Sequence, residues 1–362
     1  MKKIPILFVL LGFLCISICA NAEEKDHLSG YSLQIKEISF PIFIISRKSI
    51  VQSEKIIFAA GPEYDRLNIY LVDFKDNQTP TIAEPGSWEP ILSPDRKTIA
   101  YNQLDLDKLD AQNRTYPNDV YVMNWNGSNK KRLTFKGRRL IQGWSDDGNT
   151  LYLCTGGIIE SGIWPAWDCN GKDYWSIKKD GSNLKKIASL PKKEKEVEVK
   201  TLTIGGNKEI KRHDIYFKNK KVYSTPNFLT ETETAWEAEA LKLNGGNILV
   251  IEFKPLQGKK APFYSHDGKC NLVLANAENP RENRLIAQDI GCFSPLSVSP
   301  NKQFIIYHGG KDFYLATSNF KTKIRIGLGF CDVAWSRDSK SFCVESGRNL
   351  EQKLHWINII KK

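Results

Sequence analysis

The sequence of 362 residues predicts an all-β protein, and the first observation behind this prediction is a turn motif that returns along the chain. Each copy contains Ser, then Pro or a polar residue, then Asp or Asn, and a run rich in β-branched and aromatic residues follows. Pro presets the backbone of a turn, Asp and Asn bond to their own turn, and the residues that follow suit a strand. The copies begin at Ser93, Ser145, Ser299 and Ser336.

The second observation is a hairpin motif that follows the turn motif. Residues 119–134 read as a strand, an Asn-Gly turn and another strand, and residues 173–187 repeat this pattern around Asp180 and Gly181. Together the two motifs form a four-stranded antiparallel unit of about 40 to 50 residues. Such a unit repeated around a circle is typical of a β-propeller. We therefore expect a single β-propeller domain over residues 23–362.

This repeat resembles that of TolB-like β-propellers, whose consensus joins Trp-Ser-Pro-Asp-Gly and a strand to a Tyr-Val-Met-Asn-x-Asp-Gly-Ser hairpin that ends in Arg-Leu-Thr. Residues 87–188 match the pattern closely and residues 292–344 moderately, whereas residues 190–290 depart from it apart from a similar turn at 242–249. The resemblance implies a propeller fold and a place in the cell envelope. TolB has an additional amino-terminal domain for which this sequence leaves no room, so its partner-binding role is not transferred.

Counting the repeat units predicts seven blades. Five units are anchored by the turn motifs and by a similar turn near Asn244. An earlier unit spans residues 54–83, and a degenerate unit is built from residues 197–204 and 215–223. Six blades are the alternative, if the degenerate unit is an insertion.

The last repeat ends after its third strand, at residues 354–359, which leaves one sheet edge without a partner strand. Residues 32–36 near the amino terminus can supply the missing strand. Because an open sheet edge promotes aggregation, we expect this pairing to close the ring.

The amino terminus predicts export. Two lysines precede an apolar run over residues 4–18, and the small residues Ala20 and Ala22 stand where a signal peptidase reads the chain. We expect residues 1–22 to be a signal peptide and the mature chain to be periplasmic or secreted. The alternative is a retained anchor, either helical or a lipid on Cys19. No second long apolar segment follows, so no membrane span is expected after the signal peptide is removed.

Cysteine usage predicts disulfides. The sequence has 8 cysteines, and the six that lie after the signal peptide are an even number in a chain expected to be exported. The three expected pairs are Cys154–Cys169, Cys270–Cys292 and Cys331–Cys343. The first is favoured because it would close a local loop between two strands of one blade, and the other two are local guesses. Zinc is not expected, because the sequence has no Cys-x-x-Cys pair and no cysteine–histidine cluster.

The chain is basic, with 52 Lys and Arg against 41 Asp and Glu and a formal net charge of +11. A positive field favours anionic partners such as envelope polysaccharide, lipopolysaccharide or nucleic acid. The alternative is a solvated rim, because most lysines are spread over turns and outer strands. The one dense cluster contains Lys130, Lys131, Arg132, Lys136, Arg138 and Arg139. No aromatic RNA-binding platform accompanies it, so nucleic acid is not an expected partner.

Two long connections predict a ligand-binding face. They span residues 102–118 and 155–172, belong to adjacent blades, and join the second and third strands of those blades, so they lie at the same face. In the first connection, Asp105, Asp107 and Asp110 have an acidic spacing that suits oxygen ligands for calcium. The alternative is a plain solvated loop, and no other cofactor is expected.

The second long connection contains Trp164 and Trp167, which stand between the two cysteines that we expect to pair. Two tryptophans in a pinned surface loop fit a patch that stacks on sugars or binds a protein. The alternative is a small satellite core beneath the loop. The expected partner is an envelope protein or an anionic polysaccharide, and we expect the chain to be a monomer.

Catalysis has little support in the sequence. There is no Gly-x-Ser-x-Gly motif, and a His-Gly-Gly run at 308–310 lies between two predicted strands, where it reads as a turn. Four histidines are spread over several units: His213, His266, His308 and His355. We therefore assign no catalytic residue and expect a noncatalytic propeller that binds or scaffolds an envelope partner. A metal-assisted polysaccharide lyase on a propeller fold is the alternative.

Overall fold

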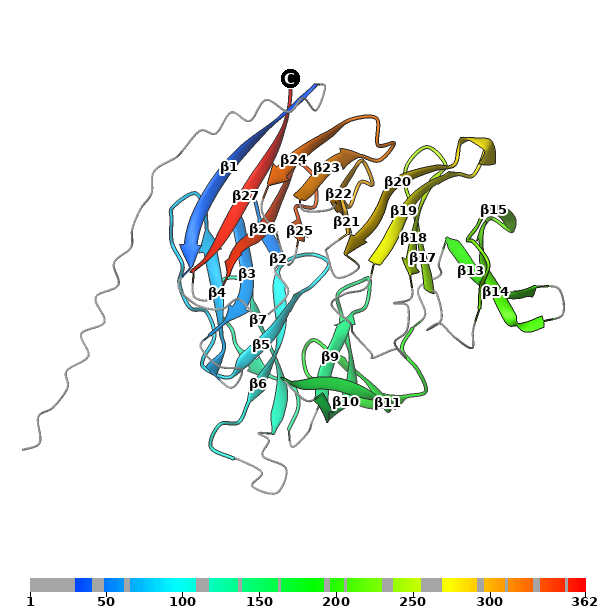
Figure 1. The fold of residues 1–362 in the computed structure, drawn as a ribbon. Helices are drawn as coiled ribbons and strands as arrows, with labels where there is room; N and C mark the ends of the chain where they lie inside the picture. Colours follow the sequence, from blue (N-terminus) through cyan, green and yellow to red (C-terminus); the bar gives the residue numbers. More distant parts are fainter. Residues whose placement is uncertain are drawn as a thin grey trace, which may run out of the picture.

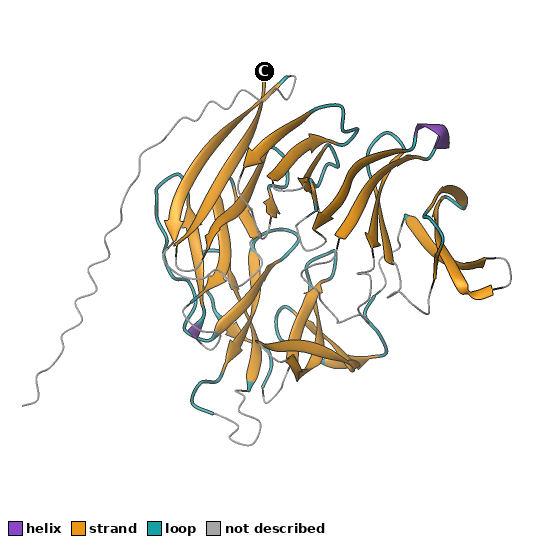
Figure 2. Ribbon diagram, viewed as in Figure 1, coloured by secondary structure: helices purple, strands orange, loops and turns teal. Residues whose placement is uncertain are grey.

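Seven antiparallel sheets surround a common centre in the computed structural model of the chain (Figure 1). The structure describes residues 30–40, 49–61, 66–108, 117–135, 139–161, 164–191, 196–204, 207–229, 237–254, 269–291, 296–309, 312–327, 333–348 and 351–362. Strands dominate these residues, and η2 (Pro280–Glu282) is a short 3-10 helix between two of them (Figure 2). The expected seven-bladed, all-β propeller is confirmed, and six blades are excluded.

The first three blades follow the chain from strand to neighbouring strand. Blade 1 consists of β2 (Ser49–Gln52), β3 (Lys55–Ala60) and β4 (Asn68–Asp73). Blade 2 consists of β5 (Ser87–Leu92), β6 (Thr98–Leu104), β7 (Asn118–Asn124) and β8 (Lys131–Arg132). Blade 3 consists of β9 (Arg139–Trp144), β10 (Thr150–Ser161), β11 (Trp164–Lys178) and β12 (Lys185–Ile187).

The remaining blades complete the ring. Blade 4 consists of β13 (Val197–Ile204), β14 (Asn207–Phe217), β15 (Lys220–Ser224) and β16 (Phe228–Leu229). Blade 5 consists of β17 (Glu237–Lys242), β18 (Asn247–Lys254), β19 (Lys269–Asn276) and β20 (Arg284–Gly291). Blade 6 consists of β21 (Ser297–Val298), β22 (Phe304–Gly309), β23 (Asp312–Thr317) and β24 (Lys323–Gly327). Blade 7 consists of β25 (Val333–Trp335), β26 (Ser341–Arg348), β27 (Glu351–Lys361) and β1 (Tyr31–Phe40).

The repeated turn motif has the same hydrogen bonds in each of its four copies. In blade 2 the hydroxyl of Ser93 donates to Asp95 over 2.6 Å and accepts from the backbone N–H of Thr98 over 3.0 Å. The carboxylate of Asp95 also accepts from the backbone N–H of Lys97 over 3.0 Å. The copies at Ser145, Ser299 and Ser336 repeat these bonds. Short polar side chains thus close the turn locally, which explains why the motif could be recognised from the sequence.

The degenerate unit forms blade 4. Its first predicted segment, residues 197–204, coincides with β13. The second, at 215–223, is interrupted by a turn at Lys218 and Asn219, whose φ angles are 50° and 63°. Both residues adopt the left-handed conformation that glycine favours, and no glycine stands there to mark the turn. The predicted segment 215–223 therefore contains the end of β14, a turn and most of β15.

Closure of the ring is confirmed. The amino-terminal strand β1 pairs antiparallel with β27, from Tyr31 opposite Lys361 to Phe40 opposite Gln352. The strand is longer than the predicted 32–36. Its side chains also contribute to packing, because Tyr31 meets the ring of Phe304 edge-on with centroids 5.4 Å apart. The pairing removes the open edge of the last repeat.

The core is divided among the junctions between neighbouring blades. Hydrophobic clusters of buried side chains join blades 1 and 2, 2 and 3, 4 and 5, 5 and 6, 6 and 7, and 7 and 1. Among the described residues, no such cluster joins blades 3 and 4. Each blade that packs on both faces is held by side chains alternating between two clusters, as expected for strands buried on both sides.

Candidate binding site

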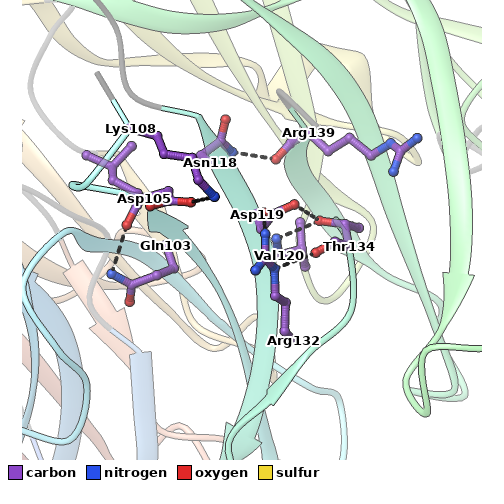
Figure 3. Close-up of polar contacts among 10 residues, drawn as sticks. Gln103, Asp105, Lys108, Asn118, Asp119, Val120, Arg132, Thr134 and Arg139 are labelled. Carbon is purple, nitrogen blue, oxygen red and sulfur yellow. Dashed lines mark hydrogen bonds and ion pairs between the residues drawn. The ribbon is translucent and has the colours of Figure 1, made fainter. Parts of the chain in front are cut away.

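The two long connections begin from neighbouring points on blades 2 and 3. The side-chain amide of Asn118, at the start of β7, donates a 2.7 Å hydrogen bond to the carbonyl of Arg139, at the start of β9. Arg139 in turn pairs with Thr155, where the second connection was predicted to begin. We call this end of the two sheets the insertion end. Seven of the described residues that form it are labelled in Figure 3: Asp105, Lys108, Asn118, Asp119, Arg132, Thr134 and Arg139. Phe135, Trp175 and Thr155 complete it through their contacts with these arginines and with each other.

A buried carboxylate organises the blade 2 part of the insertion end. Asp119 is 4% exposed, and it accepts hydrogen bonds from the guanidinium of Arg132 and from the hydroxyl of Thr134, the latter over 2.9 Å. The same hydroxyl accepts from the backbone N–H of Val120 over 2.9 Å. A carboxylate removed from water is costly unless its oxygens are bonded in this way. The network therefore fixes the position of Arg132, whose Nε also donates to the carbonyl of Thr134 over 3.0 Å.

The fixed guanidinium of Arg132 lies over an exposed aromatic ring. Its central carbon is 4.8 Å from the centroid of Phe135. Phe135 is 66% exposed, more than any other large hydrophobic side chain identified as exposed among the described residues. The positive charge attracts the face of the ring, and this pairing holds the ring at the surface without a hydrophobic pocket. Phe135 is consequently available to a partner.

A second guanidinium–aromatic pair lies on blade 3. The guanidinium of Arg139 is 4.4 Å from the ring centroid of Trp175, and the indole N–H of Trp175 donates to the hydroxyl of Thr155 over 3.2 Å. Figure 3 shows the guanidinium of Arg139 pointing away from Asp119. Burial lowers the pKa of Arg139, and the charge of Asp119 partly offsets the effect. Arginine nevertheless stays protonated at neutral pH, so the insertion end presents two arginine cations stacked on rings.

The predicted calcium ligands do not converge in the described part of the chain. Asp105 forms an ion pair with Lys108, with 2.8 Å between the carboxylate oxygen and Nζ. Asp107 is exposed, and Asp110 lies outside the described residues. The described residues contain no group of three or more His, Cys, Asp or Glu side chains that could hold a metal ion. Calcium binding stays a prediction.

The structure corrects the prediction of a loop at 155–172. Its described backbone continues β10 and β11 as a long hairpin, in which Trp164 pairs with Ser161 and Trp167 pairs with Ile158. The segment was predicted as a long connection between two strands, but the strands resume pairing after a register shift beyond Cys154. The side chains of Trp164 and Trp167 lie outside the described residues, so their role in binding stays a prediction.

The cysteines divide into two groups. Cys154 is buried and disulfide-bonded. Cys169 lies on the neighbouring strand opposite Gly156, and its side chain lies outside the described residues, so the Cys154–Cys169 pair stays a prediction. Cys270 and Cys343, in contrast, are buried thiols.

The predicted pairs Cys270–Cys292 and Cys331–Cys343 are therefore wrong. The side chain of Cys343 packs into the cluster between blades 7 and 1. The side chain of Cys270 packs into the cluster between blades 5 and 6. Both act as small hydrophobic core residues. Cys292 and Cys331 lie outside the described residues.

The described histidines do not gather at one place. His213 is buried in blade 4, where its Nδ1 is 3.0 Å from the hydroxyl of Thr201. His355 is in blade 7, with its Nε2 2.5 Å from the hydroxyl of Ser346. Burial lowers the pKa of His355, and the nearby Glu37 partly offsets the effect. His266 and the side chain of His308 lie outside the described residues.

The sequence reading identified the arginines of the insertion end but missed their aromatic partners. It included Arg132 and Arg139 in a basic cluster, whose members Lys136 and Arg138 lie outside the described residues. Phe135 could have been noticed as a large apolar residue directly after the Arg-Leu-Thr end of a hairpin motif. Trp175 had no such signal, because it belongs to the core-like pattern of a strand.

No family model and no curated protein matches the sequence. Among solved structures, an oligogalacturonate lyase from Vibrio parahaemolyticus is similar, with 9% identity over 89% of this chain and 91% of the other and a TM-score of 0.46. The β-propeller domain of the Trilobed protease from Pyrococcus furiosus has 12% identity over 88% and 93% and a TM-score of 0.45. TolB from Acinetobacter baumannii has 14% identity over 76% and 65% and a TM-score of 0.34.

These similarities are too distant to carry an argument about activity. The propeller fold rests on the seven sheets of this chain. No helix among the described residues is long and apolar enough to cross a membrane.

Proposed function

We propose that this chain is an exported, noncatalytic β-propeller that binds an acidic polysaccharide of the cell envelope at the insertion end of blades 2 and 3. The observation that carries the proposal is the pair of arginines stacked on rings, Arg132 on Phe135 and Arg139 on Trp175. Guanidinium groups recognise carboxylates and phosphates, and aromatic faces stack on sugar rings. An acidic sugar polymer combines both of these chemical features.

Binding is favoured over catalysis by the layout of the described side chains. A lyase needs a base and charge-stabilising groups that converge on one substrate position. The described histidines, His213 and His355, belong to blades 4 and 7 and lie in separate hydrogen-bonding environments. Binding needs only an accessible surface with the right charge, and the net charge of +11 supports an anionic partner. The alternative is a protein partner in the envelope, which an experiment must distinguish from an acidic polysaccharide.

The test measures binding of the mature chain, beginning at Glu23, to polygalacturonate and to neutral dextran by calorimetry. The expected result is binding to the acidic polymer alone, weakened about tenfold or more by Phe135→Ala. The matched control is Phe320→Ala, which removes the same ring from blade 6 and leaves the insertion end unchanged. Equal affinity for the two polymers, or wild-type affinity in a folded Phe135→Ala variant, would contradict the proposal.

Two further measurements separate the alternatives. Appearance of unsaturated uronate products on incubation with polygalacturonate would instead support a lyase. A mature amino terminus at Glu23, read by mass spectrometry of the chain recovered outside the cytoplasm, is the result expected from export through a cleaved signal peptide. A chain that retains residues 1–22 after export would instead support the anchored alternative.

A further inference from the structure

A hollow opens at the other end of the sheets, where blades 7, 1 and 2 meet near the centre. Consecutive connections of an antiparallel sheet lie at opposite ends of a strand, so the turn before β6 is remote from the insertion end. The hollow has a volume of about 460 Å³, within the range of small-molecule sites. Its lining includes Ile50, Leu92, Pro94, Arg96, Trp335 and Arg337.

The hollow has a structural cause in blade 1. Where blade 2 has four turn residues between Ser93 and Thr98, blade 1 has only two between Gln52 and Lys55. At the junction of blades 2 and 3, in contrast, the longer turns of the two blades meet. A side chain added at Gly148 of blade 3 would come within 3.4 Å of Pro94 of blade 2. The short turn of blade 1 therefore leaves space between the turns of its two neighbours.

Two arginines face this space from the flanking blades. Arg96 comes from the turn of blade 2 and Arg337 from the turn of blade 7, and both line the hollow. Burial lowers the pKa of Arg96, the charge of Arg337 lowers it further, and Asp338 offsets part of the effect. Both groups stay charged at neutral pH, so two like charges lie close together in a partly desolvated position.

The adjacent carboxylates are already engaged in the turns. Asp95 accepts hydrogen bonds from Ser93 and the backbone of Lys97. Asp338 accepts from Ser336 and the backbone of Lys340 in the same way. Neither carboxylate makes an ion pair with Arg96 or Arg337 within the part of the chain that the structure describes. The guanidinium donors thus keep their capacity to bind an anion.

The backbone at Arg96 has the conformation that this turn position adopts in each of its four copies. Its φ angle is +60°, in the left-handed region, and the equivalent position in blade 3 is Gly148 with φ of +68°. Glycine adopts this conformation readily, whereas a residue with a side chain is strained there. The same conformation recurs at this turn position at Lys302 and Ser339, with φ of +58° and +60°, so the turn itself holds the backbone of Arg96 in a fixed conformation beside the hollow.

We propose that this hollow is a binding site for a small molecule that carries an oxyanion, either a phosphate or a carboxylate group, held between the guanidinium groups of Arg96 and Arg337. Planar guanidinium groups bind both kinds of oxyanion through paired hydrogen bonds. The bound anion would neutralise two like charges that otherwise repel. Because the site is at the end of the sheets opposite the insertion end, it is separate from the proposed polysaccharide surface.

The test is a titration of the mature chain with inorganic phosphate and, in a second arm, with malonate. Calorimetry and thermal melting are both followed at constant ionic strength set with chloride. The expected result is a saturable rise in melting temperature with one of the two anions, which identifies whether phosphate or carboxylate is preferred. Absence of a saturable response to both anions would overturn the proposal.

The decisive variant is Arg96→Gly, which installs the residue that blade 3 has at the same turn position. In chloride alone it is expected to melt at or above the wild-type temperature, because strain and charge repulsion are both relieved. Its affinity for the anion is expected to fall about tenfold or more. Lys302→Gly is the matched control, because Lys302 has φ of +58° at the same position in blade 6.

The control is expected to keep the wild-type response to the anion. A wild-type response in Arg96→Gly, or an equal loss in Lys302→Gly, would show that the arginine pair is not the site. Arg337→Ala provides a second variant that leaves the backbone of the blade 2 turn unchanged. It is expected to lose the response as Arg96→Gly does.

Discussion

The hydroxyl of Ser145 donates a 2.5 Å hydrogen bond to the carboxylate of Asp147, and this bond has a direct consequence for acid stability. That bond and those from the backbone and side chain of Asn149 lower the pKa of Asp147 to about 2. Blade 6 has Asn301 at the equivalent position, where the same bonds form without a titrating group. Asn301 thus shows that the turn also forms with a side chain that does not titrate.

We predict that Asp147→Asn weakens the dependence of stability on pH in acid. A carboxylate whose pKa is lowered in the folded state contributes stability above its unfolded pKa, near 3.8, and loses it as pH falls through the folded value of about 2. Wild type should therefore lose more stability than the variant between about pH 4 and pH 2. Urea unfolding at each pH measures the difference, and parallel curves for the two proteins would contradict the prediction.

Thr134→Val is expected to destabilise the fold. The substitution keeps the shape of the side chain and removes the hydroxyl that bonds both Asp119 and the backbone of Val120. Leaving buried polar groups without a partner costs about 1–3 kcal/mol. Thr203→Val on an exposed position of β13 is the control, with an expected change within about 0.5 kcal/mol. Similar unfolding midpoints in urea for both variants would argue against the importance of the network.

Deletion of residues 31–40 is expected to cause aggregation. The deletion removes β1, exposes the backbone edge of β27, and takes away the aromatic contact between Tyr31 and Phe304. An exposed edge strand is a template for pairing with another chain. Size-exclusion chromatography with light scattering should show higher-mass species for this variant and a monomer for a chain that lacks only residues 23–29. A monomeric deletion variant with unchanged melting would refute this role of β1.

Thiol labelling tests the state of the cysteines. Cys270 and Cys343 are buried, so alkylation of the native protein is expected to leave both unmodified. Both should react once the protein is unfolded, whereas Cys154 should react only after a reductant is added. Peptide mapping by mass spectrometry reads each site. Reaction of Cys154 in unfolded, unreduced protein would show that Cys154 forms no disulfide. A bond from Cys154 to a cysteine other than Cys169 would refute the predicted pair.

The parts of the fold that could be predicted are those held by local interactions. Each Ser-x-Asp turn is closed by hydrogen bonds within six residues, so its sequence reveals it wherever it occurs. The turn at Lys218 and Asn219 was missed, because both residues adopt positive φ angles and no glycine marks the turn in the sequence. The long β10–β11 hairpin was also missed, because residues 155–172 were predicted as a connection between two strands, whereas backbone pairing continues through their described part.

The candidate site was predictable only in part. Arg132 and Arg139 were recognised from the sequence as members of one basic cluster. Their interaction with rings depends on geometry that a sequence does not contain. Trp175 reaches Arg139 because β11 folds back beside β10, and β10 in turn pairs with β9. The arginine pair of the hollow likewise depends on a third blade, because the short turn of blade 1 leaves the space that the two arginines line.

The pairing of β1 with β27 also determines when the molecule can become native. Among the described strands, β1 is synthesised first and β27, its neighbour in the sheet, is synthesised last. Contacts between such distant parts of a chain form slowly, because the intervening loop must close first. Every nascent form of the chain therefore has β1 without its partner, and a single late event completes blade 7. The emergence of β27, rather than the folding of any one blade, sets the earliest time of ring closure.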